Sequence, residues 1–81
     1  MDDMANTTER IADKVRGIAA EKRSSQQNTA DILGISRTSV VERMNGRIPF
    51  TATEILLLAT AWQVPVSRFF PREIAIVEAA A

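Results

Sequence analysis

The sequence predicts an all-α fold, a compact domain of five helices, and three observations support this prediction. Apolar residues recur at intervals of three and four along most of the chain, as they do when one face of a helix packs on a core. Residues that begin helices (serine, threonine) or end them (glycine, proline) divide the 81 residues into short segments. Hydrophobic residues make up 46% of the chain, which is enough for a single compact core.

The first predicted helix runs from Thr8 to Arg23 and follows a flexible tail at residues 1–6. Thr8 can cap its N-terminus, and the glutamate that follows favours a helix start. Apolar residues from Ile11 onward recur at helical spacing, while the basic side chains lie mostly on the solvent side. Gly17 weakens this helix by about 1 kcal/mol relative to alanine, and we expect it to let a neighbour pack closely.

Two shorter helices follow, joined by a tight turn at Gly34. Ser25 caps the segment Gln26–Leu33, and Gly34 supplies the positive φ that ends it. Ser36 caps the segment Arg37–Asn45, which the next glycine ends in the same way. Two short helices joined by a turn of three or four residues are typical of a helix-turn-helix, which places its second helix in the major groove of DNA.

The last two predicted helices follow a loop. Thr51 and Glu54 form a T-x-x-E capping box at the start of a strongly apolar helix that ends at Trp62. A proline before Val66–Phe70 suits the start of a short fifth helix, and another proline ends it. The predicted organisation is therefore a tail at residues 1–6, a helix-turn-helix domain at residues 7–71 and a C-terminal tail at residues 72–81.

The outward face of the third helix, at about residues 36–45, carries groups that can read base edges. Val40 and Met44 are spaced by four and form its buried side. Arg37 has the planar guanidinium that matches guanine O6 and N7, worth about 1–3 kcal/mol of discrimination. The predicted base contacts are Arg37, Thr38, Val41 and Glu42. The alternative interpretation is an ordinary solvated helix face. The turn and the two caps favour base contacts over this alternative.

Residues that border this helix predict contacts with the DNA backbone. A helix N-terminus favours an anion, and the amide of Gln26 lies where a phosphate would approach. The guanidinium of Arg43 can reach a phosphate while its stem packs. The predicted backbone contacts are Arg23, Ser25, Gln26, Ser36, Ser39, Arg43, Asn45, Arg47 and Thr51. For Gln26 an ordinary surface glutamine remains an equal alternative.

Charge distribution supports this surface more than total charge does. The net charge is zero, although phosphate neutralisation supplies most non-specific affinity for DNA. Between Lys22 and Phe50, however, five basic residues stand against two acidic ones, a local net charge of +3.

Composition argues against other functions. The chain has no cysteine and no histidine, which removes thiolate and imidazole ligands as well as the commonest general base. Its carboxylates are scattered and it has no glycine-rich phosphate loop, so we expect no enzyme, no metal, no cofactor and no small-molecule ligand. No apolar run could span a bilayer, and Asp2 and Asp3 stand where a signal peptide needs positive charge. We expect a cytoplasmic protein, in a bacterial host if phage-encoded, that does not bind membranes.

Three motifs extend this interpretation: S-Q-x-x-x-A-D-x-L-G-I-S-R-T-S-V from Ser25, the N-G pair at residues 45–46, and V-P-V-S-R-F-F at residues 64–70. From about Thr8 to Phe70 the chain resembles the Cro/repressor-type (XRE-like) helix-turn-helix family of phage and bacterial regulators. The resemblance implies a compact repressor-like domain and a transcriptional regulator, a phage-type repressor or a Cro-like protein, that binds operator DNA.

The same resemblance implies roles for single residues. Positions that match Gln26 and Asn45 often contact phosphate, and positions that match Arg37, Thr38 and Glu42 read bases. The chain departs from the family pattern at three positions. Thr29 stands where the family usually has leucine, Arg43 where it has a bulky apolar residue, and Met44 where glutamate is frequent. The first departure is expected to weaken a core contact, and the second leaves the groove geometry open.

A dimer is expected because two half-sites one helical turn apart give a symmetric protein the usual specific affinity. Apolar residues near the C-terminus exceed what the core needs. The candidate dimer contacts are Phe69, Phe70, Ile74, Ile76 and Val77. Alternatively, these residues seal the core. A second class of function is a protein-interaction module, such as an antitoxin or an adaptor, built on the same fold.

Overall fold

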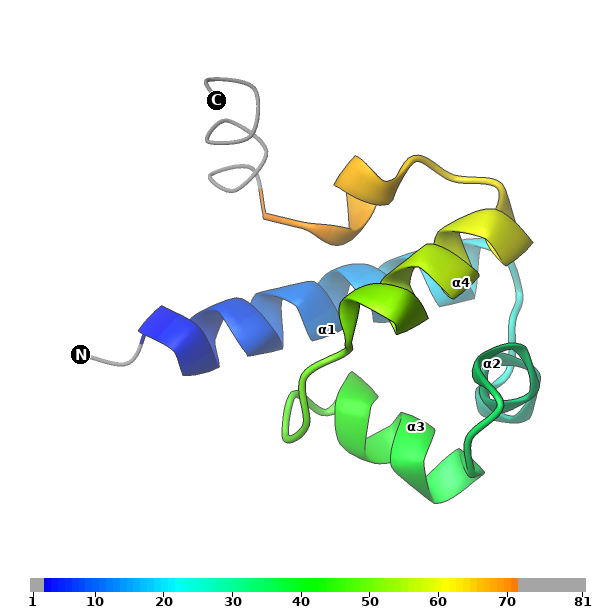
Figure 1. Ribbon diagram of the computed structural model, residues 1–81, viewed down its shortest axis with the longest axis horizontal. Helices are drawn as coiled ribbons and strands as arrows, with labels where there is room; N and C mark the ends of the chain where they lie inside the picture. The colour runs from blue at the N-terminus through cyan, green and yellow to red at the C-terminus, as the bar shows by residue number, and fades with distance from the viewer. Residues whose placement is uncertain (1–2, 72–81) are drawn as a thin grey trace.

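The computed structural model describes residues 3–71 and, from residue 7 onward, their side chains. Within that range the chain forms four α-helices, a closing 3₁₀-helix and no strand (Figure 1). The elements are α1 (Asp3–Glu21), α2 (Gln26–Leu33), α3 (Arg37–Met44), α4 (Ala52–Trp62) and η1 (Val66–Phe69). The all-α prediction is confirmed. The prediction of five α-helices is wrong, because the segment between Pro65 and Pro71 holds only one 3₁₀ turn.

The first helix is longer than expected. α1 begins at Asp3 rather than Thr8 and ends at Glu21, two residues before the predicted end. Residues 3–7 contain no glycine or proline that would stop a helix, so residues 3–6 of the expected tail belong to α1. Figure 1 shows the N-terminal end of α1 reaching beyond the other helices.

The expected packing at Gly17 is absent. A methyl group added there would meet no atom within 4 Å among the neighbours. No described element packs closely against this glycine, and it lines an open cleft instead.

The core forms where all five elements meet. Its centre contains fully buried side chains from α1, α3, α4 and η1: Val15, Val40, Leu58 and Phe69. The rings of Trp62 and Phe69 are stacked, with centroids 6.2 Å apart and planes inclined by 12°. No helix among residues 3–71 is both long and apolar enough to cross a membrane.

The burial of Phe69 corrects its assignment as a dimer contact. Its side chain is 0% exposed, so it has no surface to offer a partner. Phe70 is half-buried and packs against the core. This supports the alternative that both residues seal the domain. The other candidates, Ile74, Ile76 and Val77, lie outside the described residues.

Thr29 is accommodated in the core by its hydrogen bonds. It is fully buried, and its hydroxyl donates to the carbonyl of Ser25 at 2.9 Å and lies 3.0 Å from the hydroxyl of Ser24. A buried hydroxyl is costly only when it lacks a partner. The threonine therefore joins the start of α2 to the preceding loop.

Replacing Phe69 with alanine should lower the free energy of unfolding by about 3–5 kcal/mol, because the change opens a cavity beside Trp62. Urea denaturation would measure this loss, and Phe70→Ala should cost less because its side chain is only half-buried. A Phe69→Ala protein that keeps its stability but loses self-association would return Phe69 to the dimer surface.

Candidate nucleic-acid interface

The junction between α2 and α3 follows from local hydrogen bonds. Gly34 has φ 69° and ψ 31°, the left-handed conformation that ends α2, and its N–H donates to the carbonyl of Ala30 at 2.8 Å. The hydroxyl of Ser36 accepts from the N–H of Ser39 at 3.1 Å and caps α3. The predicted bounds of α2 are therefore confirmed, as are the caps at Ser25, Gly34 and Ser36. α3 ends at Met44, one residue before the predicted end, and its C-cap is Asn45. Figure 1 shows α2 nearly end-on and α3 side-on, so their axes cross steeply.

α3 has one buried side and one open side. Val40 and Met44 face the core as predicted. On the other side lie the four predicted base contacts. Arg37 and Thr38 are exposed, and Val41 and Glu42 are half-exposed. The outward direction of these side chains agrees with the expectation, and their contact with DNA stays a prediction.

Arg37 and Gln26 join the starts of the two helices. The Nε of Arg37 donates to the Oε1 of Gln26 at 3.2 Å, and both residues are exposed. Among the described residues this is the only hydrogen bond that the guanidinium makes, so its two terminal nitrogens remain available to a ligand.

Arg43 turns inward, which contradicts its predicted phosphate contact. Its Nε donates to both carboxylate oxygens of Glu54, at 3.0 and 3.1 Å, and Nη1 donates to the carbonyl of Ser39 at 3.3 Å. The two charged side chains are only 16% and 11% exposed. The physical reason is that α4 begins directly behind α3 and presents a carboxylate there.

Glu54 also completes the predicted capping box of α4. Its Oε1 accepts from the N–H of Thr51 at 2.9 Å, while the hydroxyl of Thr51 accepts from the N–H of Glu54 at 3.1 Å. The T-x-x-E pattern predicts this box, but the arginine that joins it as a third member was not predicted. The one available signal was the polar residue at position 43, where the resembled family has an apolar one.

The C-terminal end of α3 is attached to α1. The guanidinium of Arg16 donates to the carbonyl of Met44 and also pairs with Asp13. After α3, Gly46 has φ 78°, and a Cβ on it would lie 3.0 Å from the Cγ of Glu9. The loop after α3 therefore packs closely against α1, and only glycine fits this position without strain.

Glu42 and Arg47 form an ion pair at the edge of the outward face. The distance from Nη1 of Arg47 to Oε2 of Glu42 is 3.1 Å, and the side chains are 70% and 34% exposed respectively. Exposed pairs of this kind contribute about 0–1 kcal/mol. The pair can therefore open at little cost.

The other predicted backbone contacts lie at helix ends and turns. Arg23 is exposed in the turn after α1 with φ 55°, and Asn45 is exposed at the C-cap of α3. The hydroxyls of Ser25, Ser36 and Thr51 each accept a backbone N–H as helix caps. The hydroxyl of Ser36 also donates to that of Ser39 at 3.0 Å.

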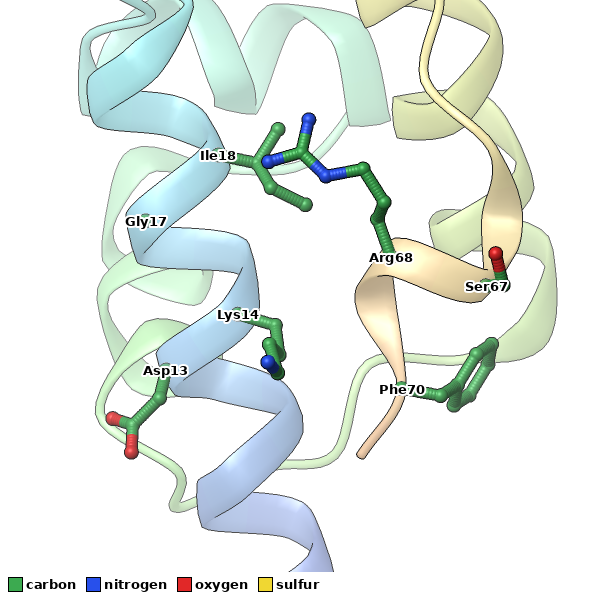
Figure 2. Close-up of a pocket in the computed structure, with 7 residues that line it drawn as sticks. All are labelled: Asp13, Lys14, Gly17, Ile18, Ser67, Arg68 and Phe70. Carbon is green, nitrogen blue, oxygen red and sulfur yellow. The ribbon is translucent and has the colours of Figure 1, made fainter. Parts of the chain in front are cut away.

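A separate cleft of about 440 Å³ lies between α1 and η1, on the far side of the molecule from α3 (Figure 1). Figure 2 shows Lys14 and Arg68 at this cleft.

The guanidinium of Arg68 donates to both carboxylate oxygens of Glu21, at 2.9 and 3.1 Å. These hydrogen bonds, with the charge of Arg68, lower the pKa of Glu21. Any stability from this exposed pair is present above the ordinary pKa and is lost as the pH falls through the lowered one.

Residues 2–75, nearly the whole chain, match the BetR domain family. The chain belongs to that family. BetR domains are small, helical and DNA-binding-like, in agreement with the all-α fold. The match is to this family rather than to the Cro/repressor-type family that the motifs resemble. No match was found among curated proteins. Residues 3–71 of this BetR domain contain no group of three or more histidine, cysteine, aspartate or glutamate residues that could hold a metal ion.

Replacing Arg43 with methionine should lower the free energy of unfolding by about 1–3 kcal/mol, because Glu54 would lose a donor while remaining nearly buried. Arg47→Met is the matched control, and its exposed pair should cost less than about 1 kcal/mol. Chemical denaturation of both variants would make the comparison. Equal losses would mean that the Arg43–Glu54 pair does not hold α3 to α4.

Proposed function

We propose that this BetR domain is a sequence-specific regulator of transcription that binds double-stranded DNA. In this proposal α2 and α3 act as a helix-turn-helix, and α3 lies in the major groove of an operator half-site. The finer proposal is a phage-type repressor or Cro-like protein that binds two half-sites as a homodimer. Family membership supports the general function, and the shape of the α2–α3 surface supports the mode of binding.

One observation carries the proposal: α3 is attached to the rest of the domain on every side except the outward one. The hydroxyl of Ser36 caps the N-terminus of α3, and the Arg43–Glu54 pair connects the side of α3 to α4. Arg16 of α1 donates to the carbonyl of the last residue of α3. The outward side chains are thus held in a fixed geometry, which base readout requires.

Arg37 is the proposed main base contact. Its terminal nitrogens can donate to guanine O6 and N7 while Nε stays bound to Gln26. Gln26 would orient the guanidinium, and its own amide N–H can donate to a phosphate. Thr38 and Val41 would extend the readout along the groove through a hydroxyl and a thymine contact.

We further propose that the domain binds rather than catalyses, and needs no cofactor. The chain contains no histidine or cysteine, and the two carboxylates of α3 and α4, those of Glu42 and Glu54, each pair with an arginine. The competing proposal is a protein-interaction module, for which the zero net charge is the supporting observation. Selection of bound duplexes from a random pool would decide between the two and would supply the operator sequence.

DNA affinity should fall steeply as salt rises from about 50 to 200 mM, because each neutralised phosphate releases counterions. Fluorescence anisotropy with a selected duplex would give the slope of log affinity against log salt concentration. A flat dependence, or no binding to any duplex, would favour the protein-interaction module.

Two arginine variants separate base readout from backbone binding. Arg37→Ala should cost about 1–3 kcal/mol on the preferred site and relax the preference at one base pair. Arg47→Ala should weaken all duplexes about equally and reduce the salt slope by about 1. Binding to a panel of single-base variants would reveal both patterns. Parental binding by both variants would mean that α3 does not face the groove.

A further inference from the structure

The outer face of α4 is solvent-exposed and carries no charge. The only ionisable residue in this helix is Glu54, which turns inward to Arg43. Leu56 is 58% exposed and Leu57 is 41% exposed, although leucines of a surface helix usually pack inward. This face of the helix therefore offers apolar and small side chains to the solvent.

The exposed residues of this face form a palindrome. Reading along α4 they are alanine, threonine, leucine, leucine, threonine and alanine, at positions symmetric about the midpoint between residues 56 and 57. The α4 face, as we call it, consists of Ala52, Thr53, Leu56, Leu57, Thr60 and Ala61, all exposed. The six residues have helical spacing, so they lie on one side of the helix.

A palindromic face fits a second copy of itself. In a two-fold contact, if residue i touches residue j, then j touches i. When two α4 helices pack antiparallel about an axis between residues 56 and 57, leucine meets leucine and threonine meets threonine. The alanines at both ends let the helices approach closely. An uncharged face is also matched best by a surface without charge, which a second copy supplies.

We propose that the α4 face is the contact between two copies of this domain on DNA, with the two α4 helices antiparallel. This inference rests on the proposed function, since it supplies the homodimer that binds two half-sites. It replaces the dimer surface expected at Phe69 and Phe70. Stable interfaces bury about 800 Å² per partner, which is far more than six side chains of one short helix cover. The contact is therefore weak in free protein and forms when adjacent half-sites bring two copies together.

The first test separates dimer contact from DNA binding. Leu57→Lys should leave affinity for a single half-site unchanged and weaken binding to a two-half-site operator by about 10²-fold. Val66→Lys is the matched control, because Val66 is also 41% exposed but lies in η1. It should bind both duplexes like the parent, and circular dichroism would confirm that both variants fold. If Leu57→Lys keeps the parental affinity for two half-sites, the α4 contact is wrong.

The second test fixes the register by disulfide formation and does not depend on DNA. The natural chain has no cysteine, so an introduced thiol reports only its own position. Leu56→Cys should cross-link to a second copy, because its position lies next to the two-fold axis. Thr60→Cys alone should not cross-link, since residue 60 of one copy and residue 60 of the other lie about 10 Å apart along the helices.

An equimolar mixture of Thr53→Cys and Thr60→Cys should cross-link, because these positions face each other across the axis. The oxidation is carried out at millimolar protein without DNA and again on the two-half-site duplex. Failure of parental DNA binding would refute the proposed function, while cross-links in free protein would still support the α4 contact. Cross-linking of Thr60→Cys alone, or none by Leu56→Cys under both conditions, would refute the contact.

Discussion

The position of α3 depends on one carboxylate, that of Glu54. It accepts hydrogen bonds from the guanidinium of Arg43 and from the N–H of Thr51, so a single side chain connects α3 to the start of α4. A carboxylate with so little exposure is tolerated only when it is paired and hydrogen-bonded. Among the described residues no buried side-chain nitrogen or oxygen lacks a partner. The pair is expected to add little net stability, because burying two charges costs much of what their attraction returns.

This attachment matters because α3 is too short to be stable alone. An isolated helix of eight residues is largely unfolded in water. Its side chains can be presented to a duplex in fixed positions only because neighbouring elements hold it. Arg16 from α1 and Glu54 from α4 act at different points along α3. In the proposed mode of binding, recognition by Arg37 would thus depend on residues that do not themselves touch DNA.

The surface around α3 and the α4 face differ in charge, and each therefore suits a different proposed partner. The segment around α3 is basic and carries side chains with free donors, which suits a phosphate backbone and base edges. The α4 face carries no charge, so it neither attracts nor orients a polyanion. A neutral domain with a local positive surface is expected to bind DNA weakly as a single copy. In the proposed dimer, pairing through the uncharged α4 face would add affinity without adding non-specific attraction.

Local contacts explain what the sequence determined by itself. The caps at Ser25, Ser36 and Thr51 and the turn at Gly34 join residues three or four apart, so residue type and spacing were enough to predict α2, the turn and the start of α4. The buried side of α3 followed from its periodicity in the same way. Only the tertiary structure decided that Arg43 turns inward, that Phe69 lies in the core and which residues form the outer side of α4. A side chain at the edge of a helix takes its direction from the element packed beside it, and that neighbour is far away in the sequence.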